Sequence, residues 1–252
     1  MELFGHGLIS TELDLGRLIS ERRRMHTYAE RTNPPYKVIN FSLSNGSTNL
    51  PEIKLTRFID PAPFVPSDKA GRDKRCENII NIQAMGLKTR IAHTGVDSVV
   101  VGISGGLDST LALLVASKAF DMLAKDKKNI IAVTMPCFGT TDRTYNNAVA
   151  LAQCLGVSLL EVPIKAAVEQ HFKDIGHDGS VHDLTYENSQ ARERTQVLMD
   201  IAGKYNGFVV GTGDLSELAL GWATYNGDHM SMYGINASIP KTLVRHLIEY
   251  FA

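Results

Sequence analysis

The chain has 252 residues, of which 44% are hydrophobic and 21% charged, enough for one large or two small globular domains. Its 26 lysine and arginine residues almost balance its 27 aspartate and glutamate residues. The net charge of -1 excludes a global basic field of the kind that gathers nucleic acid or anionic membranes. We therefore expect no nucleic-acid partner, and any polyanion must be held by a local site.

Cysteine usage and hydropathy indicate a cytoplasmic protein. The three cysteines, Cys76, Cys137 and Cys154, are far apart and without CxxC spacing, which argues against a disulfide framework and a structural zinc site. The longest aliphatic run, Leu111–Ala116, is too short to cross a bilayer. The first residues lack the basic flank and the apolar stretch of an export signal. We expect neither a membrane segment nor an exported form.

The first 66 residues differ in composition from the rest of the chain. Six of the nine prolines lie there, and they break the apolar pattern into short strand-like runs such as residues 37–43. This composition is typical of a connector or of the remnant of another unit. Three consecutive arginines, Arg22, Arg23 and Arg24, could contact a phosphate, although a solvated helix end is the preferred interpretation.

The regular part of the chain begins with apolar residues at helical spacing over Ile79–Ile91, and strands then alternate with helices. The predicted strands span residues 97–103, 129–134, 158–162 and 207–210. The predicted helices that alternate with them span residues 107–123, 142–155, 164–174 and 189–205. This alternation predicts an α/β fold with a doubly wound, Rossmann-like parallel sheet.

The loop after the first predicted strand carries the strongest motif. Residues 102–110 read GISGGLDST and lead directly into a helix, so backbone N–H groups and a helix N-terminus are available to an anion. Ser104 and Ser109 add hydroxyl donors. No lysine follows the glycines as in a Walker A loop, and the pattern is not GxGxxG. The loop therefore does not indicate a kinase-like protein or a dinucleotide-binding oxidoreductase.

An acidic residue, Asp108, stands in this presumed phosphate cradle. A carboxylate there repels a phosphate unless it holds a Mg²⁺ that the phosphates share, so we expect Asp108 to be a magnesium ligand. The alternative is a tight strand-to-helix turn in which Asp108 is an acid of the first helical turn. Ligands of parallel sheets bind beyond the carboxyl ends of the strands, so the loops after Thr134 and Val210 should lie beside this one.

Two groups of motifs resemble known families. SGGLDS at residues 104–109 resembles the pyrophosphate loop of the N-type ATP pyrophosphatases, which include the synthetases of NAD, GMP, asparagine and argininosuccinate and several tRNA-modifying enzymes. GTGDLSELALGWATY at residues 211–225, followed by residues 227–228 and 240–242, is similar to the signature of the glutamine-dependent NAD synthetases. YENSQAR at residues 186–192 matches the same family, in which this helix start contacts the dinucleotide substrate.

The resemblance implies amidation of deamido-NAD with ATP, Mg²⁺ and ammonia through an adenylate, in an adenine nucleotide alpha hydrolase-like fold. The residues implied in ATP binding are Gly102, Ile103, Ser104, Gly105, Gly106, Leu107, Asp108, Ser109, Thr212 and Lys241. The residues implied in deamido-NAD binding are Asn188, Arg192, Glu217, Trp222, Thr224 and Tyr225. The implied catalytic residues are Asp108, Glu217 and Lys241, with Asp108 and Glu217 as the metal ligands.

Several of these residues have plainer interpretations. Taken alone, Glu217 is a helix-surface acid and Lys241 a first-turn lysine, but their joint occurrence at the family's spacing favours the functional roles. Trp222 and Tyr225 are either core aromatics or neighbours of the nicotinic acid end of the substrate. Met232 departs from the family pattern, because the matching position is acidic in the ammonia-dependent enzymes.

The resemblance also implies a domain organisation. Residues 1–66 resemble the end of a nitrilase-type glutaminase domain with its linker, and residues 67–252 resemble a NAD synthetase domain that continues further in the family. We expect the intact protein to contain a glutaminase domain that supplies ammonia, and to form at least a homodimer. Cys137 is expected to be a small loop residue, because no histidine or lysine partner for a nucleophile is recognisable. Another N-type ATP pyrophosphatase and an inactive nucleotide-binding fragment remain as alternatives.

Overall fold

The computed structural model describes residues 13–25, 37, 39–40, 58–139 and 141–252. Backbone contacts divide the chain into two units, Met1–Pro61 and Ala62–Ala252. In the first unit, helix α1 (Leu15–Arg24) starts at its N-cap Asp14 and ends in the three arginines, whose side chains are exposed. The interpretation of this basic cluster as a solvated helix end is confirmed. The predicted strand-like run at residues 37–43 lies mostly outside the described residues.

The second unit contains a five-stranded sheet with the strand order β3-β2-β1-β4-β5, in which every neighbouring pair is parallel. The strands are β1 (Ser98–Gly102), β2 (Ile130–Thr134), β3 (Ser158–Glu161), β4 (Gly207–Gly211) and β5 (Tyr233–Gly234). From β1 the chain proceeds outward through β2 and β3, and it then returns to the other side of β1 through β4 and β5. The predicted doubly wound α/β fold is confirmed, and its switch point lies between β1 and β4.

The helices of this unit lie between and after the strands. They are α2 (Lys69–Thr94), α3 (Leu107–Leu123), α4 (Asp142–Leu155), α5 (Lys165–Ile175), α6 (Leu184–Lys204), α7 (Leu215–Leu220) and α8 (Lys241–Phe251), with a 3₁₀ turn η1 (Lys127–Asn129) before β2. Helices α3 and α4 coincide with the predicted residues. No element was predicted with bounds after β4, so β5 was missed and the extents of α7 and α8 were not predicted.

Two helices begin earlier than predicted, at capped first turns that lie outside the apolar periodicity. Helix α2 begins after its N-cap Asp68, whose side chain accepts a hydrogen bond from the backbone N–H of Gly71. Helix α6 begins after Asp183, which accepts from the backbone N–H of Tyr186. The capping carboxylates satisfy N–H groups that have no partner inside the helix, so both helices extend beyond their apolar faces.

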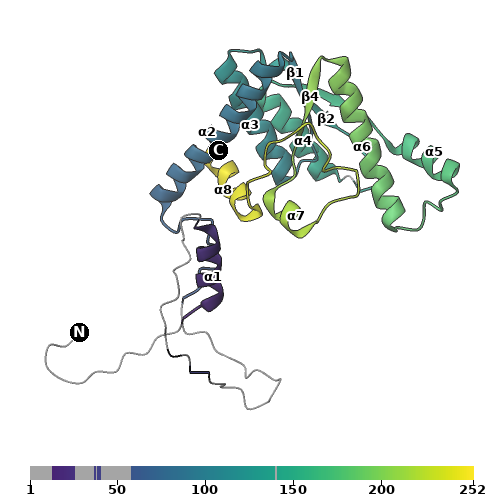
Figure 1. Cartoon of the computed structure of the whole chain (residues 1–252). Helices are drawn as coiled ribbons and strands as arrows, with labels where there is room; N and C mark the ends of the chain where they lie inside the picture. The colour runs from purple at the N-terminus through teal and green to yellow at the C-terminus, as the bar shows by residue number, and fades with distance from the viewer. Residues whose placement is uncertain (1–12, 26–36, 38, 41–57, 140) are drawn as a thin grey trace. The chain divides into compact units, whose positions relative to one another are not determined.

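Alternate residues of the central strands face opposite sides of the sheet. Val99 and Val101 of β1 pack into a core shared with α2, α3 and α8, whereas Val100 packs with Val209 of β4 into a second core under α6. Figure 1 accordingly shows α2, α3 and α8 on one side of the strands and α6 on the other. Helices cover both faces of the sheet, so its carboxyl edge is the part of the sheet that is open to a ligand.

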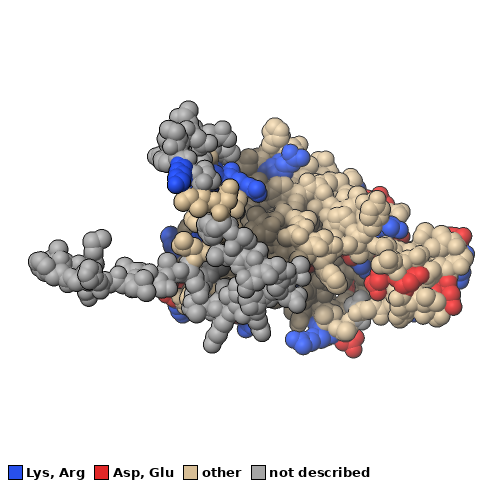
Figure 2. Space-filling model, turned by 60° about the horizontal axis from the view of Figure 1, so that its bottom comes forward, with Lys and Arg blue, Asp and Glu red and all other residues tan. Residues whose placement is uncertain are grey.

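The surface carries charges of both signs. Figure 2 shows one face that is mostly uncharged, with acidic side chains most frequent at the end of the molecule that contains α5 and α6. The described residues of this face form no broad basic patch of the kind that binds nucleic acid. No helix of the described residues is long and apolar enough to span a membrane.

Candidate active site

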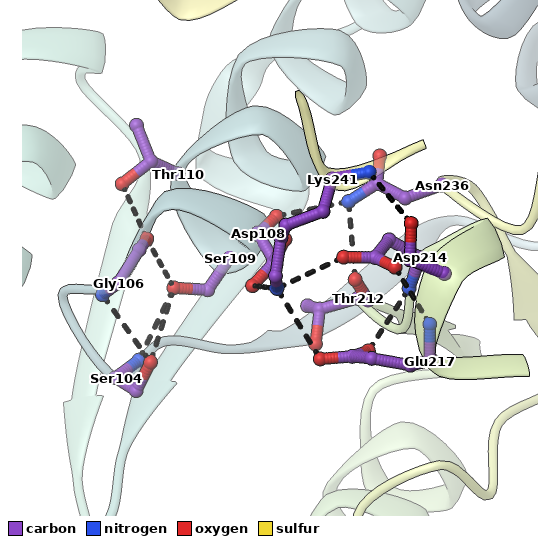
Figure 3. Close-up of polar contacts among 11 residues, drawn as sticks. Ser104, Gly106, Asp108, Ser109, Thr110, Thr212, Asp214, Glu217, Asn236 and Lys241 are labelled. Carbon is purple, nitrogen blue, oxygen red and sulfur yellow. Dashed lines mark hydrogen bonds and ion pairs between the residues drawn. The ribbon is translucent and has the colours of Figure 1, made fainter. Parts of the chain in front are cut away.

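The phosphate loop between β1 and α3 is held in one conformation by its own residues. Gly105 has φ +75°, and a Cβ at this position would lie 2.0 Å from the carbonyl oxygen of Thr144, so only glycine fits. Ser104 Oγ accepts a hydrogen bond from the Gly106 N–H at 3.3 Å, and Ser109 Oγ donates to the Gly106 carbonyl at 3.1 Å. The hydroxyls that we expected to face an anion thus brace the loop internally (Figure 3).

The start of helix α3 remains open to an anion. Its N-cap is Gly106, which has no side chain that could cap the first turn. The first backbone N–H groups of a helix have no intrahelical partner and carry the positive end of the helix dipole. An anion such as a phosphate group can satisfy them at this position.

A cavity of about 570 Å³ lies at the carboxyl ends of β1, β2 and β4, next to this loop. All three loops that the sequence analysis singled out contribute to its wall. Of the residues implied in ATP binding, those that line it are Gly102, Ile103, Ser104, Gly106, Ser109 and Thr212. Four of the implied residues, Gly105, Leu107, Asp108 and Lys241, lie outside the lining.

Beside the cavity, three carboxylates surround the ammonium group of Lys241 (Figure 3). Lys241 Nζ lies 2.7 Å from Asp108 Oδ2, 2.9 Å from Asp214 Oδ2 and 3.3 Å from Glu217 Oε1. Asp108 stands in the first turn of α3, and Lys241 is the first residue of α8. The structure therefore brings together the three residues that the sequence analysis named as catalytic, and adds Asp214 to them.

Asp214 is held in place by a capping box at the start of α7. Its Oδ1 accepts from the Glu217 N–H at 2.9 Å, while Glu217 Oε2 accepts from the Asp214 N–H at 3.0 Å. Sequence reasoning quoted Asp214 within the family signature but gave it no role. An Asp followed three residues later by Glu is a readable capping-box pattern, and it could have identified the residue.

The protonation equilibria of this cluster reflect burial and mutual charge. Burial, together with the nearby charges of Glu217 and Asp214, raises the pKa of Asp108 above its usual value, although the ion pair with Lys241 lowers it. Burial also opposes ionisation of Asp214, but hydrogen bonds from Lys241 and from the Glu217 backbone hold the pKa of its carboxyl below the usual range. Although burial lowers the pKa of Lys241, hydrogen bonds to Asp108 and Asp214 raise it well above its usual value. The ammonium group is therefore charged at neutral pH.

Asn236 joins the phosphate loop to the loop after β4, and sequence reasoning missed it. This residue is fully buried, and its Nδ2 donates to the carbonyl oxygens of Asp108 at 3.0 Å and Thr212 at 3.1 Å. Its Oδ1 accepts from Gln83 Nε2 of α2 at 3.1 Å. The network fixes the start of α3 relative to Thr212, and a single asparagine in a loop gives no sequence signal for such a role.

Most residues implied in deamido-NAD binding lie on or against the loop between α7 and β5. Asn188 Oδ1 accepts from the Tyr225 N–H at 3.1 Å, and Arg192 donates to the Tyr225 carbonyl through Nε at 3.2 Å and Nη2 at 3.1 Å. Thr224 Oγ1 accepts from the Asp228 N–H at 3.0 Å. The contacts of Asn188 and Arg192 fasten the loop to α6, whereas the Thr224 contact lies within the loop. None of the four residues Asn188, Arg192, Thr224 and Tyr225 lines the cavity.

The interpretation of Trp222 and Tyr225 as core aromatics is wrong. Their relative exposures are 80% and 74%, so both rings face solvent. Large exposed aromatic rings are available to a ligand or to a partner surface. Met232, the departure from the family pattern, is half-exposed, and its backbone N–H donates to the Val209 carbonyl at 3.0 Å. Its thioether offers no charge to a substrate.

Cys137 lines the cavity, and its environment fits the expectation of a small loop residue. Burial raises the pKa of its thiol. A raised pKa reduces the fraction of thiolate, which is the nucleophilic form of cysteine. The structure therefore gives no support to a covalent role for this residue.

Comparison with known proteins gives consistent matches. The NAD synthase family model matches residues 79–252. The glutamine-dependent NAD(+) synthetase of Mycobacterium leprae (strain TN) is 43% identical over 250 residues, which cover 95% of this chain and 36% of that protein. The chain thus spans a minor part of this relative's length.

Solved structures give the same result for the fold. Glutamine-dependent NAD+ synthetase from Acinetobacter baumannii, in complex with adenosine diphosphate, superposes with a TM-score of 0.65 at 30% identity over 69% of this chain and 32% of that one. The NH3-dependent NAD synthetase from Campylobacter jejuni shares the fold, with a TM-score of 0.63 at 24% identity over 70% and 73% of the two chains. The family match includes the phosphate loop and the whole cavity, and this chain therefore belongs to the NAD synthase family.

Proposed function

We propose that this chain carries out the ATP-dependent amidation of deamido-NAD to NAD, with release of AMP and pyrophosphate. The observation that carries the proposal is the phosphate loop that opens into a cavity beside Asp108, Glu217 and Lys241, in a member of the NAD synthase family. Cations and oriented N–H groups at this edge suit a reaction in which negative charge moves between phosphates.

The residues divide between the two substrates. The pyrophosphate of ATP would lie against the phosphate loop and the start of α3, with Thr212 and Lys241 on the ATP phosphates. Deamido-NAD would lie towards Asn188, Arg192, Glu217, Thr224 and the exposed rings of Trp222 and Tyr225. The hydrogen bonds of Asn188 and Arg192 with the Tyr225 backbone support the assignment to deamido-NAD indirectly. They hold the loop in the position in which the rings of Trp222 and Tyr225 are exposed.

The carboxylates beside the cavity fit a divalent cation. One ligand atom each from Asp108, Asp214 and Glu217 lie within 4.8 Å of one another. Asp108 Oδ1 is buried and has no hydrogen-bond partner among the described residues, so it has an unused acceptor. Mg²⁺, a hard cation that prefers carboxylate and phosphate oxygens, would be held by Asp108 and Glu217 and would neutralise phosphate charge when bound.

The chemistry needs two displacements. A carboxylate oxygen of deamido-NAD bonds to the α-phosphorus of ATP, and the bond from that phosphorus to the bridging oxygen breaks, so pyrophosphate leaves. Ammonia nitrogen then bonds to the acyl carbon, the bond to the AMP oxygen breaks, and the nitrogen loses a proton. The protein's part is to align the carboxylate with the α-phosphorus, to offer Lys241 to the phosphates and to keep water from the adenylate.

The remaining features are drawn from the relatives. We infer that residues 1–66 are the end of a glutaminase domain with its linker and that residues 67–252 belong to the synthetase domain. The intact protein would then take ammonia from glutamine, as the name of its Mycobacterium leprae relative indicates for that protein. A homo-oligomer of at least two chains and a cytoplasmic location complete the proposal.

The test is to incubate the purified chain with ATP, Mg²⁺, ammonium and deamido-NAD and to quantify NAD, AMP and pyrophosphate. We expect the three products in equal amounts, and none without deamido-NAD. Nicotinic acid mononucleotide in place of the dinucleotide tests the substrate class. AMP formation that does not depend on deamido-NAD would indicate a different ATP pyrophosphatase. ATP binding without any product would indicate a fragment that binds nucleotide and does no chemistry.

A further inference from the structure

The side chains of Arg194 and Asp228 connect two walls of the cavity. Arg194 of α6 and Asp228 of the loop between α7 and β5 both line it. Arg194 Nε and Nη2 each donate to one oxygen of the Asp228 carboxylate, both at 2.7 Å. Two parallel charge-assisted hydrogen bonds fix both the distance and the relative orientation of the two groups.

The loop that carries Asp228 lies unusually close to α6. A Cβ added to Gly227 would lie 2.6 Å from the Cβ of Ala191, a residue that is fully buried. The Asp228 N–H donates to Thr224 Oγ1, so the carboxylate is also positioned from within the loop. The absence of a side chain at Gly227 allows the backbone to approach α6, and Arg194 then closes the contact.

Because Arg194 is bonded to Asp228, its guanidinium group is not a free ligand for a phosphate. Its side chain is 29% exposed, and the groups of its fork that face Asp228 are engaged by that carboxylate. Glu187, another residue of α6 that lines the cavity, places a second carboxylate in the same wall. The pair therefore acts on the shape of the cavity rather than by attracting the phosphates of a ligand.

We propose that Arg194 and Asp228 form a positioning pair which holds the loop 222–230 as a wall of the nucleotide cavity and so sets the affinity for ATP. This inference rests on the proposed function in one respect, which is that the ligand of the cavity is ATP. The phosphate loop and Thr212 line the same cavity, so loss of the opposite wall should weaken nucleotide binding first. The side chains proposed to act in the reaction, Asp108, Glu217 and Lys241, are not part of the cavity lining, so turnover at saturating ATP should change little.

The experiment compares Arg194→Gln, Asp228→Asn and the charge-exchanged double variant Arg194→Asp with Asp228→Arg. Arg245→Gln, which breaks the exposed Arg245–Glu249 pair on α8, is the matched control. Calorimetry measures ATP binding, and steady-state kinetics separates the KM for ATP from kcat. Trp222 is the only tryptophan of the chain and lies in the loop, so its fluorescence anisotropy reports how firmly the loop is held.

We expect each single substitution to weaken ATP binding about tenfold, to raise the KM for ATP to the same extent and to lower the anisotropy of Trp222, with kcat nearly unchanged. The exchanged pair should recover most of the affinity, and Arg245→Gln should behave as the unaltered chain. An affinity for ATP that is unchanged in the single variants would overturn the proposal. An affinity in the exchanged pair that is as weak as in the single variants would also overturn it. Arg194→Lys, which keeps the charge but loses the fork, replaces Arg194→Gln if the latter does not fold.

Binding of ATP does not depend on turnover, so the two proposals fail separately. A chain that binds ATP but forms no NAD would contradict the proposed function and leave this test intact. A chain that forms NAD, and whose affinity for ATP does not change when Arg194 or Asp228 is substituted, would contradict the positioning role alone.

Discussion

Lys241 Nζ lies 2.7 Å from Asp108 Oδ2, and this contact joins the first residue of α8 to the first turn of α3 across 133 positions of the chain. The same ammonium group also contacts Asp214 and Glu217. Lys241 is thus the counter-ion of three carboxylates that could otherwise attract a divalent cation. Lysine and a metal ion should compete for this position until ATP phosphates offer the lysine another partner.

Lys241→Met should therefore have two opposite effects. ATP binding should weaken about tenfold to a hundredfold, because a charge-assisted contact to the phosphates is lost. Binding of Mn²⁺ in the absence of nucleotide should strengthen, because a positive charge leaves the carboxylates. Calorimetry with ATP and with Mn²⁺ alone measures both, and deamido-NAD affinity should stay within a few-fold. Lys165→Met, at the first residue of α5, is the control, and Mn²⁺ binding no tighter than in the unaltered chain would contradict the competition.

Asp108→Asn should lower the rate of NAD formation about a hundredfold to a thousandfold, because the carboxylate is assigned to the cation that stabilises phosphate charge. Folding should survive, since the side chain lies at the surface end of α3 and is 25% exposed. Asp121→Asn, near the other end of the same helix, is the control for a lost charge. Near-normal turnover of the Asp108 variant at saturating Mg²⁺ would exclude a metal ligand at this position.

Asp214 should matter for stability as well as for the site. Asp214→Ala removes the helix cap and the buried partner of Lys241, and should cost about 2–4 kcal/mol in the free energy of unfolding. Asp214→Asn keeps a capping oxygen and loses only the charge, so its cost should be smaller. Urea unfolding followed by circular dichroism measures both. Equal stability of the alanine variant and the unaltered chain would mean that the capping box contributes nothing.

The effect of the Asp214 charge should depend on pH with a defined sign. The pKa of this carboxyl is held below its ordinary value of 3.8, so the ionised form stabilises the fold at higher pH. That contribution is lost as the pH falls through the lowered pKa. The difference in unfolding free energy between the unaltered chain and Asp214→Asn should be constant from pH 7 to about pH 5 and should shrink below about pH 4. A difference that grows in acid would reverse the assignment.

Much of this fold follows from local sequence signals. Helix α3 coincides with its prediction because it has a dense apolar face, and α4 because Gly156 caps it in a left-handed conformation. The starts of α2 and α6 were missed because they depend on capping by Asp68 and Asp183 rather than on apolar periodicity. Helix α7, with six residues, is too short for periodicity to detect.

Part of the site was predictable from the resemblance to a known family rather than from local sequence signals. The resemblance named Asp108, Glu217 and Lys241 without any knowledge of their distances. Their contact depends on α8 packing against α3 through buried residues such as Leu247, which is a tertiary relationship. Neither Asn236 nor Arg194 has a local pattern, and only the folded chain brings Asn236 between Asp108 and Thr212 and Arg194 against Asp228.

The central claim is that ATP activates the substrate carboxylate as an adenylate. Deamido-NAD labelled with ¹⁸O in its nicotinate carboxylate tests this directly, with the chain, ATP, Mg²⁺ and ammonium, and with mass spectrometry of the products. The account predicts one labelled oxygen in the phosphate of AMP for each NAD formed, because the acyl carbon–oxygen bond breaks when ammonia enters. Unlabelled AMP, or label in inorganic phosphate together with ADP, would contradict it.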